Sequence, residues 1–176
     1  MNNKKENKGY IHLYTGNGKG KTTAALGLAL RAAGAGKSVY IAQFVKGMHY
    51  SELNSIKQFK TITLKQYGRN CFIEREPAKE DIEAAQNGLK DTAKVLAEGK
   101  YDMLILDEIT IALYYKLISI DAVLTLIKSK PASMELIMTG RKASKELQEM
   151  ADLITEMKEV KHYYNEGVEA REGIEY

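Results

Sequence analysis

The chain has one cysteine, two prolines and no tryptophan among its 176 residues. Because Cys71 is alone, an internal disulfide is excluded and a reducing compartment is favoured. His12, His49 and His162 have no metal-ligand spacing with one another or with Cys71, which argues against a zinc site. Nothing near Cys71 in the sequence suggests a nucleophile pair. The small number and the spacing of these residues therefore argue against a disulfide, a zinc site and a catalytic thiol.

Long hydrophobic runs are also missing. No uninterrupted apolar segment approaches membrane-spanning length, and residues 1–8 lack the apolar core of a signal peptide. The net charge is only +3, and no stripe of Lys and Arg interleaved with aromatics is visible, which disfavours a nucleic-acid partner. We therefore expect a cytoplasmic protein with no membrane or nucleic-acid partner. The polar composition of residues 1–8 predicts a flexible tail. The length of the chain predicts a single domain over residues 9–176.

The most informative feature that is present is the run T-G-N-G-K-G-K-T-T, between an apolar segment and an alanine-rich helical segment. A glycine-rich turn that opens a helix points several backbone N–H groups at one spot, where the helix dipole also favours an anion. Lys21 can reach phosphates from there, and the Thr22 hydroxyl can ligate Mg²⁺. The register differs from the common pattern G-x-x-x-x-G-K-[ST], because Thr15 holds the position of the first glycine. The run predicts a nucleoside polyphosphate site formed by Thr15, Gly16, Asn17, Gly18, Lys19, Gly20, Lys21, Thr22 and Thr23.

Short apolar runs alternate with longer helical patterns, which is typical of a mostly parallel sheet with helices on both faces. The expected strands are Tyr10–Tyr14, Ser38–Phe44, Thr61–Gln66, Met103–Leu106, Glu135–Met138 and, more weakly, Leu153–Met157. The expected helices are Lys21–Gly34, Ser51–Phe59, Lys79–Glu98, Ile120–Ser129 and Ser144–Met150. In such sheets the ligand binds beyond the carboxyl ends of the strands, so the residues directly after each strand are the candidates for chemistry.

Carboxylates and cations do follow the expected strands. Asp107 and Glu108 end the fourth, where an acid in a P-loop protein lies close to Mg²⁺, directly or through water; the sequence does not decide between them. Arg141 follows the fifth strand and could clamp phosphate oxygens or be a surface arginine. Lys46 follows the second, and a solvated lysine is an equally good interpretation. Arg31 lies on the first expected helix, at a spacing that selects no role by itself.

These motifs together resemble the ATP:corrinoid adenosyltransferases, the family that makes adenosylcobalamin in bacteria. The matching segments run in order from residue 9 to residue 176: T-G-N-G-K-G-K-T-T-A-A, R-A-A-G-A-G-K, Q-F-V-K-G, L-D-E, T-G-R and V-K-H…G-V-E-A-R-E-G-I-E-Y. The off-register phosphate loop is itself a trait of that family. The closing segment is the most specific match, because no general P-loop protein needs it.

The resemblance implies a RecA-like α/β P-loop fold, a homodimer, and transfer of the 5′-deoxyadenosyl group of ATP to cob(I)alamin with release of triphosphate. It implies that the nucleotide lies reversed in the phosphate loop, that Mg²⁺ bridges the polyphosphate and that a flavoprotein supplies cobalt(I). No protein nucleophile or general base is implied, so Lys21 and Thr22 act by positioning and charge stabilisation. The implied roles are ATP binding by the phosphate loop, Arg31 and Arg141; metal binding by Thr22, Asp107 and Glu108; and corrinoid binding by Phe72 and Lys46.

One departure from the family concerns the loop that closes on the lower face of the corrin. Members of the family have bulky aromatics there, including a tryptophan, which this chain lacks. The corresponding stretch is Tyr67–Glu74, and Phe72 is the residue expected to serve in its place.

Two other functions fit the phosphate loop and the Asp-Glu pair. A P-loop kinase of a small molecule would phosphorylate an acceptor and release ADP, but the sequence has no arginine-rich lid. A RecA-like nucleic-acid ATPase would require the basic, aromatic-lined surface that the sequence lacks.

Overall fold

The computed structural model describes residues 8–69 and 76–176, which contain one six-stranded parallel sheet. The strands are β1 (Ile11–Thr15), β2 (Val39–Phe44), β3 (Ile62–Tyr67), β4 (Met103–Asp107), β5 (Glu135–Thr139) and β6 (Leu153–Glu156), in the spatial order β3-β2-β4-β5-β1-β6. The helices are α1 (Lys21–Gly34), α2 (Glu52–Ile56), α3 (Lys79–Glu98), α4 (Ile109–Tyr114), α5 (Ile120–Lys128), α6 (Lys145–Met150) and the 3₁₀ turn η1 (Tyr163–Glu166). The predicted parallel α/β sheet is confirmed.

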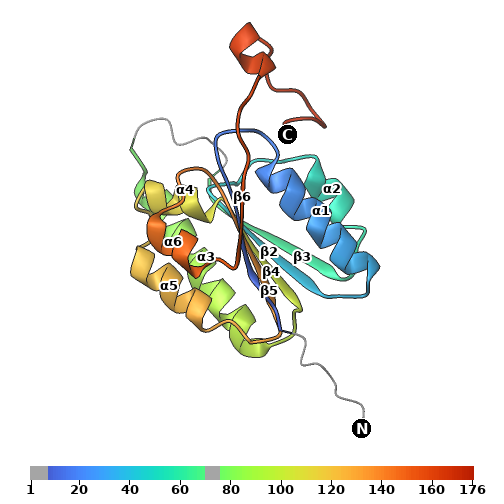
Figure 1. Cartoon of the computed structure of the whole chain (residues 1–176), viewed down its shortest axis with the longest axis vertical. Coiled ribbons are helices and arrows are strands. Elements are labelled where there is room, and N and C mark those ends of the chain that lie inside the picture. Colours follow the sequence, from blue (N-terminus) through green and yellow to red (C-terminus); the bar gives the residue numbers. More distant parts are fainter. Residues whose placement is uncertain (1–7, 70–75) are drawn as a thin grey trace.

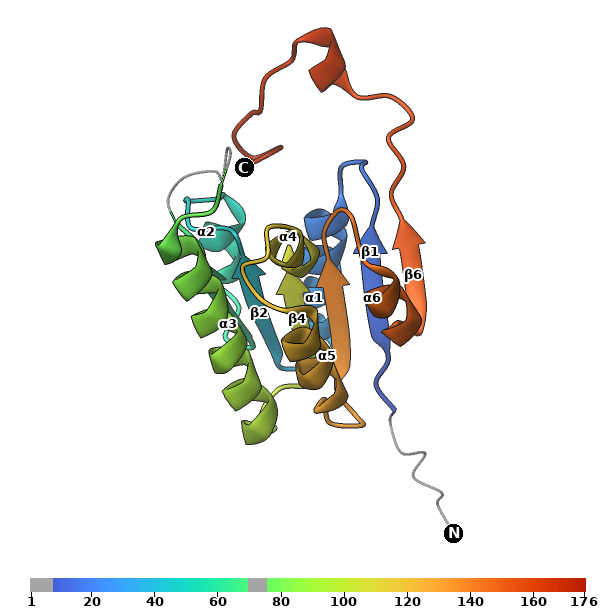
Figure 2. The same cartoon turned by 90° about the vertical axis from the view of Figure 1, so that its left-hand side faces the viewer.

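Helices cover both faces of the sheet (Figures 1 and 2). The helices α1 and α2 lie on one face, and α3, α4, α5 and α6 lie on the other. Side chains of β2 alternate between the two faces: Val39 and Ile41 pack with the alanines of α1, whereas Tyr40 and Phe44 pack toward α3. Every residue of β2 and β4 is buried, as expected for central strands of a parallel sheet.

The strand order brings the candidate residues together. The strands β4, β5 and β1 are neighbours, so Asp107, Thr139 and the loop after Thr15 meet at one edge of the sheet. On the other side of β4 lies β2, whose Gln43 is in register with Asp107.

The structure differs from the expected elements in two places. The helix α4 was not predicted, because its six residues open with the β-branched run Ile109-Thr110-Ile111, which has low helix propensity. The second helix is only Glu52–Ile56, shorter than the expected Ser51–Phe59. The weaker sixth strand is confirmed as β6, at the edge of the sheet.

The segment from residue 157 to residue 176, which we call the strap, rises from β6 and crosses above the carboxyl ends of the strands (Figure 2). The strap is mostly exposed and carries η1. Within the described residues, no helix is long and apolar enough to cross a membrane.

Candidate active site

The phosphate loop connects β1 to α1 and has left-handed backbone conformations at Gly16 (φ 97°) and Gly20 (φ 115°). Its Gly18 N–H donates to the carbonyl oxygen of Met157 at 2.7 Å. A Cβ atom at Gly16 would lie 2.4 Å from the Met157 oxygen, and one at Gly18 would lie 2.8 Å from it. The glycines therefore stand where the strap begins to pack against the loop, which accounts for their unusual register.

Lys21 lies inside the curl of this loop with only 6 % of its surface exposed. Its Nζ donates to the carbonyl oxygens of Gly16 at 2.8 Å and Gly18 at 2.7 Å. Burial, followed by the charge of Arg141, lowers the pKa of Lys21, and Glu108 opposes the shift. The loop thus holds an ammonium against two of its own carbonyl oxygens, at the amino end of α1.

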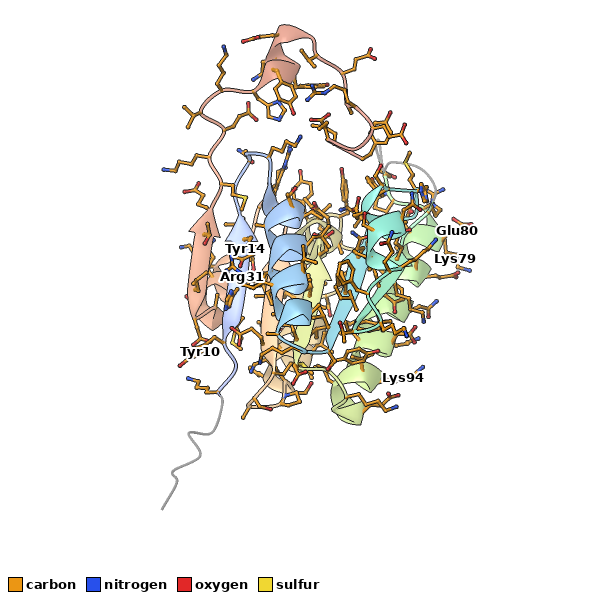
Figure 3. The ribbon with its side chains drawn as sticks, turned by 90° about the vertical axis from the view of Figure 1, so that its right-hand side faces the viewer. Tyr10, Tyr14, Arg31, Lys79, Glu80 and Lys94 are labelled. Atoms are coloured by element: carbon orange, nitrogen blue, oxygen red, sulfur yellow. The ribbon has the colours of Figure 1, made fainter. Side chains whose placement is uncertain are left out.

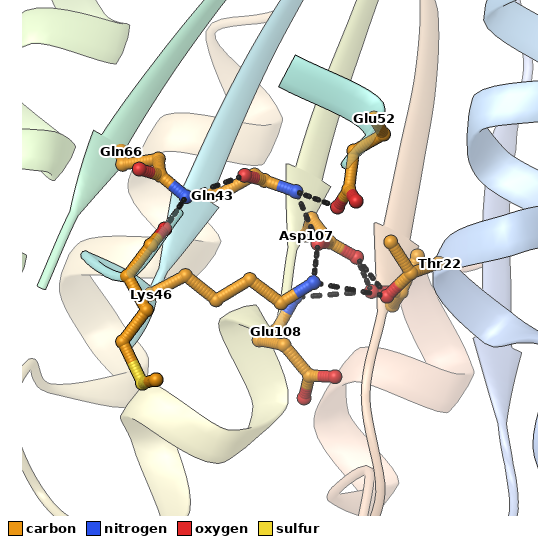
Figure 4. A network of polar contacts seen from close by, with 9 residues as sticks. Thr22, Gln43, Lys46, Glu52, Gln66, Asp107 and Glu108 are labelled. Carbon is orange, nitrogen blue, oxygen red and sulfur yellow. Dashed lines mark hydrogen bonds and ion pairs between the residues drawn. The ribbon is translucent and has the colours of Figure 1, made fainter. Parts of the chain in front are cut away.

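Asp107, at the end of β4, is the centre of a polar network (Figure 4). Its Oδ1 accepts from the Thr139 hydroxyl at 2.6 Å and from the Thr22 hydroxyl at 2.9 Å. Its Oδ2 accepts from Lys46 at 2.9 Å and from the Gln43 amide at 3.2 Å. The carboxylate is 1 % exposed, so the four donors and the Lys46 charge compensate for its loss of hydration.

Lys46 remains a cation in this network although its side chain is only 14 % exposed. Burial alone would lower the pKa of Lys46, but the charge of Asp107 and their hydrogen bond, with Glu108 and Glu52, outweigh it and raise the pKa. The ammonium also lies 5.1 Å from the centre of the Tyr50 ring.

Glu108 follows Asp107 but faces a different direction. Its backbone is left-handed (φ 59°), its N–H donates to the Thr139 hydroxyl at 3.0 Å, and its carboxylate is turned away from Asp107 (Figure 4). Burial, and then the charge of Asp107, raises the pKa of Glu108, while Lys46, Lys21 and Arg141 oppose the shift. The strained backbone at the strand end directs one acid inward to the network and the next toward the pocket.

Arg141 reaches the pocket through a tight turn after β5. Gly140 has φ 134°, and a Cβ atom there would lie 2.1 Å from Oγ1 of Thr110. The same Thr110 hydroxyl donates to the Arg141 carbonyl oxygen at 2.6 Å. The helix α4, unexpected from the sequence, thus anchors the turn that carries Arg141.

A cavity of about 820 Å³ lies between the phosphate loop, α2 and the strap. On its strap side, Glu175 accepts from Lys19 of the phosphate loop at 2.5 Å and from the Tyr163 hydroxyl. The carbonyl oxygen of Tyr176 accepts from the Ser51 hydroxyl at 3.0 Å. The cavity is lined by Gly18, Lys19, Gly20, Lys21, Thr22, Thr23, Leu26, Lys46, Tyr50, Ser51, Glu52, Ser55, Glu108, Arg141, His162, Gly173, Ile174, Glu175 and Tyr176.

Most of the residues predicted for the site are brought to this cavity. Residues 18–23, Lys46, Glu108 and Arg141 line it, and Asp107 lies behind Thr22. Residues 15–17 form the start of the loop without lining the cavity.

Two residues predicted for the site, Arg31 and Phe72, are not confirmed as part of it by the structure. Arg31 is exposed on α1, ten residues and hence about 15 Å beyond Lys21, and lies beside Tyr14 (Figure 3). The structure does not bring Arg31 to the cavity. Phe72 lies outside the described residues, so its predicted contact with the corrin stays a prediction.

The sequence did not single out several residues that complete the site. Thr139 and Gln43 lie within the segments T-G-R and Q-F-V-K-G, but their contacts with Asp107 depend on the strand order. Glu175 and Tyr163 come from the closing segment and contact Lys19 of the phosphate loop. The aromatic residues of that segment are the sequence signal that could have indicated its packing.

The donors around Thr22 are suited to a hard cation. Among the described residues, no cluster of three or more His, Cys, Asp or Glu side chains could hold a metal by itself. The hydroxyl of Thr22 and the carboxylates of Asp107 and Glu108 are all oxygen donors, and Mg²⁺ at phosphate sites commonly uses one or two carboxylates together with phosphate oxygens and waters. The residues present therefore fit Mg²⁺ bound together with a polyphosphate.

The family model and the curated relatives that match this chain all point to one enzyme family. A sequence model of the family described as ATP:corrinoid adenosyltransferase BtuR/CobO/CobP matches residues 7–176. The corrinoid adenosyltransferase CobA of Salmonella typhimurium is 33 % identical over 171 residues, which cover 97 % of this chain and 87 % of that protein. A corrinoid adenosyltransferase of Pseudomonas aeruginosa is 33 % identical over 174 residues, covering 98 % and 86 %.

Among solved structures, a KaiC-like protein of Pyrococcus horikoshii matches with a TM-score of 0.58 over 87 % of this chain and 74 % of its own, at 18 % identity. At that identity the likeness shows the fold alone, and it bears out the predicted RecA-like fold.

Proposed function

The chain belongs to the ATP:corrinoid adenosyltransferase family, and we propose that it transfers the 5′-deoxyadenosyl group of ATP to the cobalt(I) of a reduced corrinoid, releasing triphosphate. The observation that carries this proposal is that the phosphate loop, Glu108, Lys46 and Arg141 line one and the same cavity. Asp107 lies behind this lining, in contact with Lys46.

The phosphate loop is the proposed site of the polyphosphate. The N–H groups of Gly20, Lys21 and Thr22 lie at the amino end of α1, where the helix dipole favours an anion. Lys21 now donates to two loop carbonyls, and phosphate oxygens would replace them as acceptors. Arg141 adds a second cation to the cavity, near enough for its charge to lower the pKa of Lys21. These groups stabilise the negative charge that the triphosphate develops as it leaves.

Mg²⁺ is proposed to be held by Thr22 and Asp107, with Glu108 directed into the adjoining cavity and able to contact the ion through water. Thr22 and Asp107 are in contact at 2.9 Å, so one small cation could interact with both, directly or through water. When bound, Mg²⁺ would neutralise part of the charge of the polyphosphate.

The proposed reaction needs no nucleophile from the protein. Cobalt(I) of the substrate attacks C5′ of ATP, a cobalt–carbon bond forms, the C5′–oxygen bond breaks, and triphosphate leaves with the electron pair. The chain's contribution is to place the polyphosphate and stabilise it. We propose that the nucleotide lies reversed in the phosphate loop, because C5′ must then point away from the loop and toward the corrinoid.

The remaining assignments are proposals on weaker grounds. Phe72 and Lys46 are proposed to contact the corrinoid, although Lys46 contacts Asp107 in this structure. ATP binding by Arg31 would require contacts other than those of the cavity. A flavoprotein reductant and a homodimer are proposed because the family's reaction requires cobalt(I) and because the resemblance implies a dimer.

An anaerobic assay tests the proposed function. The protein is mixed with ATP, Mg²⁺ and chemically reduced cobalamin, and the absorbance spectrum is followed before and after illumination. The expected result is a light-sensitive alkylcobalamin spectrum that requires both ATP and the protein. No spectral change, with ATP converted to ADP as an added acceptor is phosphorylated, would instead support a P-loop kinase.

A further inference from the structure

The ammonium of Lys46 lies between two of the residues proposed to hold Mg²⁺. Its Nζ is 2.9 Å from Oδ2 of Asp107 and 3.4 Å from Oγ1 of Thr22, and it donates to both (Figure 4). In the described part of the chain, Lys46 is the cation that forms an ion pair with Asp107. A side-chain cation thus lies where the proposed metal site would place a divalent one.

The hydrogen-bond directions at Thr22 support this interpretation. A hydroxyl has one proton and two lone pairs, and the proton of Thr22 is directed to Oδ1 of Asp107 at 2.9 Å. The lone pairs therefore face the Lys46 ammonium, as they would face a bound metal ion. The donors and acceptors are already arranged for a cation at this point.

The backbone around Lys46 is built to place it there. Val45 has φ 59°, which is unusual for a β-branched residue, and its N–H donates to the Tyr67 carbonyl oxygen at 3.0 Å. A Cβ atom at Gly47 would lie 2.4 Å from the Gly68 carbonyl oxygen, so the turn packs closely against the loop after β3. A strained turn held from both sides points Lys46 over the end of β4.

Charge balance gives the placement a reason. The Asp107 carboxylate is 1 % exposed, and a buried carboxylate without a cation is strongly destabilising. A protein that binds Mg²⁺ only together with its nucleotide needs another cation at Asp107 before the nucleotide arrives. Lysine suits this task because its compact charge is carried on a flexible four-carbon stem.

We propose that Lys46 is a positioning residue that substitutes for the metal: in the nucleotide-free protein it occupies the position between Thr22 and Asp107, and it withdraws into the cavity, toward the bound substrates, when Mg²⁺ and ATP bind. This inference rests on the proposed function in that it takes the cavity to be a metal–nucleotide site. Lys46 lines the same cavity, so the withdrawn ammonium remains within it.

The test measures thermal unfolding of Lys46→Met with and without about 10 mM MgCl₂, in the absence of ATP and corrinoid and with NaCl at matched ionic strength as the reference. Without Mg²⁺ we expect the Tm of the variant to fall by about 10 °C, because Asp107 loses its buried partner. With Mg²⁺ we expect the Tm of the variant to rise by about 3 °C or more, because the ion occupies the vacated position. The wild-type Tm should change by less than about 1 °C.

The matched control is Lys65→Met, which makes the same change at the exposed Lys65–Asp91 pair. It should neither lower the Tm appreciably nor respond to Mg²⁺. If Lys46→Met does not fold well enough to be measured, Lys46→Gln removes the charge and retains a hydrogen-bond donor. A Tm of either variant that gains no more from Mg²⁺ than the wild type would overturn the proposal. Because no nucleotide or corrinoid is present, this outcome is independent of the adenosyl-transfer assay.

Discussion

At the scale of single residues, the site depends on buried charges that are held in place by hydrogen bonds. Asp107 accepts from two hydroxyls, an amide and an ammonium, and Lys21 donates to two loop carbonyls. Both side chains are held in one position before any substrate binds, which lowers the entropic cost of binding a polyanion. The polar groups that meet the substrate are therefore pre-organised.

Replacing Lys21 tests whether this pre-organisation serves catalysis. In Lys21→Ala the ammonium at the centre of the phosphate loop is lost, and we expect adenosyl transfer to fall by at least about 100-fold. The steady-state rate with reduced cobalamin measures the loss, and circular dichroism checks that the fold persists. Normal turnover in a folded variant would mean that the polyphosphate binds elsewhere.

The residues at the site were predictable to different degrees. The phosphate loop and the Asp107-Glu108 pair were predicted because each consists of consecutive residues of recognisable chemistry directly after an apolar strand. Thr139 and Gln43 could not be assigned to Asp107, because β2, β4 and β5 become neighbours only through the strand order. The same limit explains why the contact between Lys46 and Asp107 could not be predicted.

At the scale of elements, the strap is the part of the fold that a general P-loop protein does not need. Its first residue, Met157, packs on Gly16 and Gly18, and Glu175 near its far end contacts Lys19. Hydrogen bonds from Lys19 and Tyr163 lower the pKa of Glu175, so this carboxylate is charged at neutral pH. An anionic group thus contacts a lysine of the loop that is proposed to bind a polyanion.

We expect Glu175→Gln to bind ATP more tightly, because the change frees Lys19 and removes a negative charge from the cavity. The Lys19–Glu175 pair is partly exposed, so the expected decrease in Kd is modest, about 2- to 5-fold by calorimetry. Glu172→Gln, an exposed carboxylate of the same strap outside the cavity, is the matched control and should leave Kd unchanged. A weaker ATP affinity in Glu175→Gln alone would show that Glu175 helps to bind the nucleotide.

The turn after β5 gives a second prediction at this scale. Gly140→Ala adds a methyl group where Thr110 leaves no room, so we expect a loss of about 2 kcal/mol or more in the free energy of unfolding, measured in urea. Gly36→Ala is the matched control, because Gly36 also has a positive φ but no atom within 4 Å of the added carbon. That control should cost only about 1 kcal/mol. Equal losses at the two positions would mean that α4 does not constrain the turn.

The elements themselves were mostly predictable. The strands were expected because short apolar runs between helical patterns are typical of a parallel sheet, and β2 and β4 are indeed buried throughout. The helix α4 was missed because six residues with a β-branched start give no helical period. The path of the strap could not be predicted, because its exposed residues have no periodic pattern and its contacts with the phosphate loop and with Ser51 join residues more than about 120 positions apart in sequence.

At the scale of the whole molecule, the apolar cores and the charged groups of the cavity occupy different parts of the fold. The two cores on either side of the sheet are apolar, and the charged groups of the cavity lie at the carboxyl ends of the strands. Arg69 and Asp81 form a further ion pair away from the cavity, with Nε–Oδ1 at 2.6 Å and Nη2–Oδ2 at 2.7 Å. Asp81 also accepts from the N–H of Ala78 at the start of α3.

This pair predicts a pH dependence of stability. The hydrogen bonds that Asp81 accepts from Arg69, and then from the Ala78 N–H, lower the pKa of Asp81 in the folded protein. A carboxyl whose folded pKa lies below its unfolded value contributes stability above the unfolded value of about 4, and the contribution is lost as the pH falls through the folded value. We therefore expect Asp81→Asn to be less stable than the wild type at pH 7, and the difference to shrink below about pH 4 in urea unfolding. A difference that does not change with pH would contradict the assignment.

The measurement that tests the central claim most directly is the identity and amount of the phosphate product. ATP is incubated anaerobically with the protein, Mg²⁺ and reduced cobalamin, and the products are quantified by phosphorus NMR beside the alkylated corrinoid. If cobalt attacks C5′, one triphosphate forms for each adenosylcorrinoid and no ADP accumulates. ADP and phosphate, or pyrophosphate and AMP, in proportion to turnover would place the broken bond within the polyphosphate and contradict the account.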